Sequence, residues 1–231
     1  MRALDLGVGA RAVLSEGASG QVIATYAKAF YLRFDTGVIA VTDATAERGP
    51  IHVRCPVLPS ARAGEAMVVR GNMLGGIDLD APMWAGDRVL QKGAAGVLAD
   101  VRSPALLMGG VPDVWPACRN DLEAGDLARA AQVLGGLGPG LTPAGDDVLA
   151  GLLLVASALG YPGLDEIEVR TNEISAAYLS WAARGQGIEA AHAVLAGRSS
   201  ALDRLLAIGA TSGTAIAYGI GLGLRYLPAS T

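Results

Sequence analysis

The chain has few of the residues that fix a metal, a disulfide framework or a nucleic-acid surface. Its 231 residues include two cysteines and two histidines, which are too few and too scattered for a zinc site. Cys55 and Cys118 are most simply buried thiols of a reducing compartment. The net charge is −4. Nucleic acid is therefore not expected as the main partner, because phosphates are neutralised by a basic face.

Long apolar runs are also missing. The longest, Val148 to Leu159, is shorter than the roughly 20 residues that cross a bilayer. The start of the chain lacks the apolar core of a secretory signal. We therefore expect a cytoplasmic protein without a membrane contact. Aromatic residues make up only 5% of the chain whereas glycine occurs 32 times, which favours close backbone packing over aromatic anchors.

Before residue 115 the sequence reads as short strands between turns. The strands are rich in β-branched or aromatic residues, and Asp35-Thr36-Gly37 is typical of a hairpin turn. The pattern predicts a β-rich domain over residues 1–115, an antiparallel sheet or small barrel. The expected strands are Gln21 to Thr25, Ala29 to Phe34, Val38 to Thr42 and Ile51 to Cys55, with weaker ones at Met67 to Arg70, Leu74 to Leu79 and Val97 to Leu98.

From Asp121 onward the apolar periodicity is helical, which predicts a helical bundle over residues 116–231 and an α+β fold for the chain. Asp121 is expected to cap the first helix. The run from Val148 is apolar all round, as in a central helix packed on several sides. The other helices are expected at Leu122 to Leu134, Ile167 to Ala183, Gly187 to Ala196, Ser200 to Ile208 and Thr211 to Tyr226.

The loop at residues 135–147 is the strongest functional signal. It holds five glycines, two prolines and the adjacent acids Asp146 and Asp147. Glycine lets the backbone take positive φ angles and approach a ligand closely, and amides at a helix start can bind an anion. Gly140 and Gly145 have the spacing of a P-loop, but two acids stand where lysine and serine or threonine belong. A carboxylate or a single phosphate remains a suitable ligand.

Several roles are open for the two acids. One can cap the helix while the other orients a substrate N–H group, one can act as a base, or the pair can bind Mg²⁺ through water. Adjacent helical residues point about 100° apart, so a direct grip on one ion is disfavoured. A plain turn between helices, with one acid as the cap, is the structural alternative.

Two further segments carry polar side chains that can contribute to the site. Thr211-Ser212-Gly213 begins the last helix and can face the same cleft as the loop. Thr171, Asn172 and Ser175 are expected along one helix, where they either line the cleft or bond to their own helix. His52 and His192 are interpreted as structural.

The loop resembles a family signature. Gly-x-Gly-Leu-Thr-Pro-x-Gly-Asp-Asp, here Gly138 to Asp147, is similar to that of a bacterial family of formerly unknown function. This family includes a subunit of oxamate carbamoyltransferase from allantoin degradation. Thr211-Ser212-Gly213 and Trp115-Pro116 are weaker matches. The resemblance implies carbamoyl transfer between carbamoyl phosphate and oxamate, together with partner subunits. The Ser-Thr-Arg-Thr loop of ornithine- and aspartate-type carbamoyltransferases is not found in the sequence.

These considerations predict a site without a metal or a cofactor. Asp146, Asp147 and Thr142 are the candidate catalytic residues. Two alternatives stay open: a non-catalytic subunit that binds a small carboxylate, and a metal-dependent amidohydrolase or phosphotransferase. The candidate substrate-binding residues are Gly138, Gly140, Leu141, Gly145, Thr211, Ser212, Gly213, Asn172 and Ser175.

Overall fold

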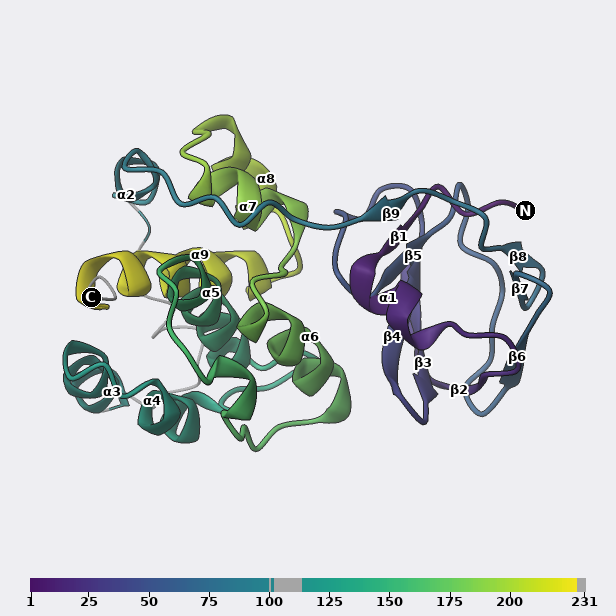
Figure 1. Cartoon of the computed structure of the whole chain (residues 1–231), viewed down its shortest axis with the longest axis horizontal. Helices are drawn as coiled ribbons and strands as arrows, with labels where there is room; N and C mark the ends of the chain where they lie inside the picture. Colours follow the sequence, from purple (N-terminus) through teal and green to yellow (C-terminus); the bar gives the residue numbers. More distant parts are fainter. Residues whose placement is uncertain (100, 102–113, 228–231) are drawn as a thin grey trace. The chain divides into compact units, whose positions relative to one another are not determined.

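The structure is a computed structural model that describes residues 1–99, 101 and 114–227 (Figure 1). It is α+β, with a β-rich first part and a helical second part, as the sequence predicts. Two compact units make up the chain, Met1–Gly86 and Asp87–Thr231. Each is described by itself. The domain limits expected from composition, 1–115 and 116–231, stay a prediction.

The first unit is a curled, half-barrel sheet (Figure 1). Its described strands follow the order β8-β7-β6-β2-β3-β4-β5-β1-β9. Most neighbours are antiparallel, but β4–β5 and β1–β9 are parallel pairs. The strands are β1 (Asp5–Gly7), β2 (Ser19–Thr25), β3 (Ala29–Phe34), β4 (Gly37–Thr42), β5 (His52–Arg54), β6 (Ala66–Arg70), β7 (Met73–Leu74), β8 (Ile77–Asp78) and β9 (Met83–Trp84).

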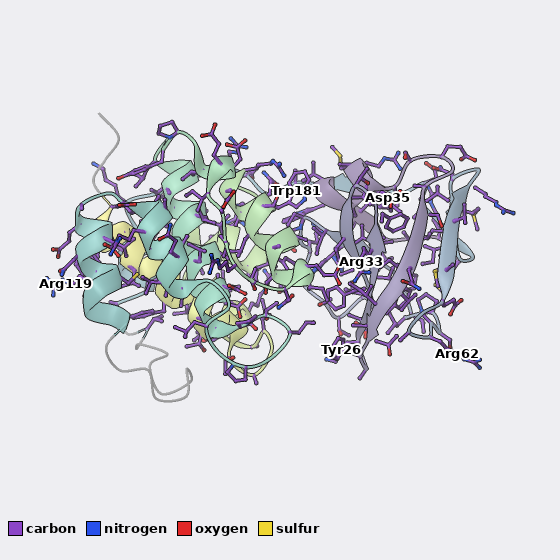
Figure 2. The ribbon with its side chains drawn as sticks, turned by 90° about the horizontal axis from the view of Figure 1, so that it is seen from below. Tyr26, Arg33, Asp35, Arg62, Arg119 and Trp181 are labelled. Carbon is purple, nitrogen blue, oxygen red and sulfur yellow. The ribbon has the colours of Figure 1, made fainter. Side chains whose placement is uncertain are left out.

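The expected hairpin turn joins β3 and β4. Phe34 pairs with Gly37, so the connection is Asp35-Thr36, and Asp35 lies in this unit as Figure 2 shows. Apolar residues of the strands, among them Leu32 and Ile39, form the core with the short helix α1 (Val8–Val13). In β4 all residues from Val38 to Thr42 are buried, so this strand is covered on both faces.

The second unit is helical. Val97, expected in a strand, ends the helix α2 instead. The stretch expected as one helix at Leu122 to Leu134 is broken at Gly125, whose φ is +75°, and Asp126 rather than Asp121 caps the second piece. Its helices are α2 (Ala94–Val97), α3 (Val114–Glu123), α4 (Leu127–Leu134), α5 (Ala144–Ala158), α6 (Glu173–Ala183), α7 (Glu189–Leu195), α8 (Ser200–Leu206) and α9 (Ser212–Tyr226), with a 3₁₀ turn, η2, at Leu164–Glu166.

Helices α5 and α9 pack side by side at the centre of this unit (Figure 1). Most of α5 is buried, as expected for a helix that is apolar all round. A Cβ added to Gly219 of α9 would lie 2.0 Å from the Val148 carbonyl oxygen, and one added to Gly151 of α5 would lie 2.3 Å from the Ile216 carbonyl oxygen. Gly151 and Gly219 therefore serve close packing, as the sequence suggests, whereas a Cβ at Gly221 of α9 would meet no described atom within 4 Å. Within the described residues, no helix combines the length and apolarity needed to cross a membrane.

Candidate functional site at the starts of helices α5 and α9

The glycine loop connects α4 to α5. Gly136, Gly138 and Gly140 have φ angles of +70°, +111° and +104°, a region that side-chain-bearing residues rarely adopt. Pro143 is the N-cap residue of α5 and makes no side-chain cap bond. The loop conformation therefore depends on its glycines, and α5 begins without the usual serine, threonine or asparagine cap.

Asp146 is fully used by the protein. Its side chain is buried, and its Oδ1 accepts a hydrogen bond of 2.7 Å from the Gly136 amide. Its Oδ2 accepts a hydrogen bond from the Thr171 hydroxyl. Asp146 thus reaches back from the first turn of α5 and ties down the start of the loop. Of the roles left open by the sequence, this arrangement is that of an anchor.

Asp147 has a different environment. It is 7% exposed, and its Oδ2 has no hydrogen-bond partner among the described residues. Burial raises the pKa of its carboxyl group from 3.8 to about 7. The hydroxyls of Ser212 and Thr142 oppose this rise, and the charge of Asp146 adds to it. A buried carboxyl group with a free oxygen and a pKa near neutrality is suited to accepting or donating a proton.

The structure brings the two helix starts together. The Thr142 and Ser212 hydroxyl oxygens lie 3.0 Å apart, and both side chains influence the Asp147 carboxyl group. This cluster of Thr142, Asp147 and Ser212 joins the start of α5 with that of α9. The expectation that both starts face one place is met, although the two segments are far apart in sequence.

The loop amides divide into two sets. Gly145 donates its amide to the Leu137 carbonyl oxygen and Gly213 to that of Ile208, so neither is available to a ligand. By contrast, the amides of Gly138, Gly140 and Thr142 donate to no acceptor within the described residues, and the same holds for those of Leu141, Ala144 and Asp146. The donors that the loop can offer to an anion are among these amides.

Glycine at positions 145 and 213 has a packing reason. A Cβ at Gly145 would lie 2.1 Å from the Leu134 carbonyl oxygen, and one at Gly213 would lie 1.7 Å from that of Leu205. Thr211, at the N-cap position of α9, makes no side-chain cap bond and is half-buried.

The segment before α6 differs from the expectation. Thr171 and Asn172 precede the helix, which begins at Glu173 because the Asn172 side chain caps it. Asn172 also donates from Nδ2 to the Leu141 carbonyl oxygen over 2.9 Å. Ser175 is buried, and its hydroxyl lies 3.5 Å from the same oxygen. These side chains therefore bond the glycine loop. Sequence reasoning found the residues but carried no signal for these partners.

The histidines have the structural roles that the sequence suggested. His192 Nε2 accepts a hydrogen bond from the Gly187 amide, and its Nδ1 lies 3.0 Å from the Asp87 carbonyl oxygen. Burial lowers the pKa of both rings, that of His52 to about 4. Cys55 and Cys118 are buried, and burial raises the pKa of each thiol to about 11. No group of three or more histidine, cysteine, aspartate or glutamate side chains suited to a metal ion occurs among the described residues.

A concave region lies toward the other end of α9, where the carboxyl-terminal residues of that helix meet α3. It has a volume of about 390 Å³. Arg119, labelled in Figure 2, lies over the ring of Tyr226 at 5.2 Å and pairs with Glu123. None of the residues predicted from the sequence as catalytic or substrate-binding lines it.

Comparison with known families supports the resemblance read from the loop. Residues 134–224 match the family described as oxamate carbamoyltransferase subunit AllH. The matched segment includes the glycine loop and the starts of α5, α6 and α9. The resemblance is therefore confirmed for this segment. No solved structure matches the chain.

Proposed function

We propose that this chain is a subunit of a carbamoyltransferase and that its glycine loop binds a small anionic substrate. The proposed reaction is carbamoyl transfer between carbamoyl phosphate and a small amide or carboxylate such as oxamate. The observation that carries the proposal is the Asp147 carboxyl group, which is buried between two helix starts with one oxygen unpartnered. A family match to a subunit of this kind of enzyme supports it.

The transfer needs one proton acceptor and a place for developing negative charge. The amide nitrogen of oxamate attacks the carbonyl carbon of carbamoyl phosphate, the bond from that carbon to the phosphate oxygen breaks, and phosphate leaves with the electron pair. The nitrogen loses one proton, which Asp147 accepts in our proposal. A pKa of about 7 makes the base available near neutral pH.

The remaining parts of the site suit the anionic groups. The free amides of Gly138, Gly140 and Thr142 and the hydroxyls of Thr142 and Ser212 are donors for phosphate or carboxylate oxygens. The positive end of the α5 dipole adds to their effect. Such fixed donors act by positioning and by stabilising charge, and they require no covalent nucleophile. Asp146, with both oxygens bonded, maintains the loop rather than touching substrate.

A matched pair of serines provides the test. Ser212 lies at the start of α9 within the cluster, whereas Ser199 lies exposed at the start of α8 and makes no side-chain cap bond. Calorimetric titration with carbamoyl phosphate, phosphate and oxamate would be run on Ser212→Ala, Ser199→Ala and Asp147→Asn. We expect Ser212→Ala to bind the anion about tenfold more weakly than the wild type, the effect of one lost hydrogen bond. Ser199→Ala should bind the anion as the wild type does.

Turnover is measured on the same proteins as phosphate release and oxalurate formation, with partner subunits present. We expect Asp147→Asn to lose turnover by 10²-fold or more, which is typical for a positioned base. Equal anion affinity in the wild type, Ser212→Ala and Ser199→Ala would remove the site from consideration.

A non-catalytic binding subunit is the second candidate. The cluster of Thr142, Asp147 and Ser212 contains no histidine or lysine that would activate the hydroxyls of Thr142 and Ser212 as nucleophiles. Anion affinity in the wild type together with full turnover of the complex carrying Asp147→Asn would favour this function. The metal-dependent alternative has less support, because both oxygens of Asp146 accept hydrogen bonds from the protein. Loss of turnover with EDTA would revive it.

A further inference from the structure

We propose that Asn172 is a positioning residue of this site: it holds the Leu141 peptide so that Thr142 faces Ser212 and Asp147. The inference rests on the proposed function for its consequences in catalysis. Its geometric content is independent of that function. No contact between Asn172 and a substrate is required.

Asn172 makes two kinds of bond at once. Its Oδ1 accepts hydrogen bonds of 3.0 Å from the amides of Ile174 and Ser175, which caps α6. Its Nδ2 donates to the Leu141 carbonyl oxygen over 2.9 Å. The amide side chain therefore links a rigid helix start to the loop peptide directly before Thr142. An asparagine is needed for both, because aspartate and serine accept the cap bonds but lack the amide donor.

The backbone around Thr142 explains why such a bond matters. Gly140 precedes Leu141 with a φ angle of +104° and no heavy atom within 4 Å of where its Cβ would be. This glycine therefore leaves the chain free to turn. On the other side, Pro143 restricts Thr142 to extended conformations. The direction of the Thr142 side chain thus depends on the Leu141 peptide, and Asn172 is the residue that holds this peptide.

The neighbouring Thr171 holds the other end of the loop. Its hydroxyl donates to Asp146, which in turn accepts from the Gly136 amide. Residues 171 and 172 therefore tie both the beginning of the loop and its last peptides. Ser175 adds only a weak contact, since its hydroxyl lies 3.5 Å from the Leu141 oxygen.

The variants separate the two bonds of Asn172. Asn172→Ser keeps a good helix cap and introduces no charge, but its side chain is too short to cap α6 and reach Leu141 together. Asn172→Ala loses both. Ser175→Ala removes the weak contact with Leu141. Asp126→Ala is the control: it removes the cap of α4, because the Asp126 side chain accepts from the Arg129 amide and does not contact the loop.

Two measurements need no ligand. The first is the ¹⁵N order parameter of Gly140, Leu141 and Thr142, which we expect to fall in Asn172→Ser from the rigid-backbone range near 0.85 toward values below about 0.6. The second is the titration of the Asp147 carboxyl carbon. Because the Thr142 hydroxyl lowers the pKa of Asp147, displacing Thr142 should move this titration to higher pH.

The outcomes divide cleanly. If Asn172→Ser leaves both the order parameters and the Asp147 titration unchanged, the inference is overturned. It is also overturned if Asp126→Ala changes them equally, since the effect would then be a general loss of helix order. Ser175→Ala should behave as the wild type or nearly so.

The consequence for anion binding is tested last. We expect Asn172→Ser to bind carbamoyl phosphate about tenfold more weakly at an unfolding midpoint close to that of the wild type, as for one lost hydrogen bond. If the wild type binds no anion, the proposed function fails while the loop measurements still decide the role of Asn172. If the wild type binds and Asn172→Ser binds equally well, Asn172 does not position the site.

Discussion

The two units treat buried charge differently. In the sheet unit, the buried Asp5 pairs with Arg54 at 3.1 Å and with Arg48 at 3.5 Å. In the helical unit, Asp146 accepts hydrogen bonds from an amide and a hydroxyl, whereas Asp147 Oδ2 has no hydrogen-bond partner in the part of the chain that the structure describes. A charge opposite is the ordinary way to keep a carboxylate ionised when buried. Asp147 has no opposite charge beside it. A buried carboxyl group of this kind is avoided in structural cores but is common where a site handles a proton.

The sheet unit also contains a buried polar atom without a hydrogen-bond partner among the described residues, so the contrast lies in the compensation of charge. Among the described residues, Arg54 Nε has no hydrogen-bond partner, but its other two nitrogens bond Asp5 and the Ala44 carbonyl oxygen. The charge of Arg54 is therefore compensated. For Asp147, no cation of the described part of the chain opposes the rise of its pKa. This contrast can be broken or sharpened by four experiments.

The largest effect is expected from the pH dependence of stability. The folded-state pKa of Asp147, about 7, lies above its ordinary value of 3.8. The folded state thus holds the proton more tightly, and the contribution of Asp147 is complete below about pH 4 and is lost as pH rises to 7. A shift of about three units corresponds to on the order of 4 kcal/mol.

Asp147→Asn should remove that slope and be more stable than the wild type at pH 8. Urea unfolding of both proteins at pH 4, 6 and 8 measures this. The lowered pKa of His52 affects the free energy of unfolding with the opposite sign, because protonating this buried ring in acid destabilises the folded protein. That contribution is the same in both proteins and cancels in their difference. Parallel pH profiles would show that Asp147 is ionised without penalty.

The second experiment breaks the ion pair of the sheet unit. Arg54→Met leaves Asp5 buried, with the half-exposed Arg48 guanidinium 3.5 Å away. We expect a loss of about 3 kcal/mol, typical for removing one partner of a buried pair. Unfolding by urea at pH 7 measures it, and the double variant Arg54→Met with Asp5→Leu should recover part of the loss. A neutral Arg54→Met would mean that the two units do not differ in this respect.

The third experiment tests Asp146 as an anchor. Asp146→Asn replaces an acceptor-only carboxylate by an amide that can satisfy one of its two donors at most. We expect a loss of about 2 kcal/mol, the value of a hydrogen bond to a charged group. Asp147→Asn should leave the free energy of unfolding at pH 8 unchanged or raise it. This neighbouring substitution is therefore the control for Asp146→Asn. Equal effects would remove the distinction between the two acids.

The smallest effect is expected at an exposed cap. The Asp126 side chain accepts a bond of 2.9 Å from the Arg129 amide at the start of α4. Asp126→Ala should cost about 1 kcal/mol, as measured by urea unfolding at pH 7. It calibrates what a solvent-accessible capping aspartate contributes in this chain. A loss as large as that of Asp146→Asn would contradict the distinction between an exposed cap and a buried anchor.

Much of the architecture can be predicted from local patterns. The strand at Ala29 to Phe34 and the turn at Asp35 follow from aromatic and β-branched composition and from turn chemistry, which act between near neighbours. The central place of α5 follows from its uniform apolarity. Where local signals conflict with a cap or a glycine, the prediction was wrong: Asn172 delays the start of α6, and Gly125 divides the helix expected up to Leu134.

The candidate site was predictable in its components and not in its connections. The sequence by itself determined that a glycine-dependent loop precedes the central helix, because the positive φ angles of Gly138 and Gly140 favour glycine. The helix begins at Ala144, four residues before the start at Val148 that apolarity alone predicts. Only the tertiary structure decided which of the two aspartates anchors the glycine loop. Asp146 meets Gly136 and Thr171, whereas Asp147 meets Thr142 and Ser212. Adjacent residues of a helix point about 100° apart, so their partners depend on how α6 and α9 pack against the loop, and that packing is decided by contacts between segments distant in sequence.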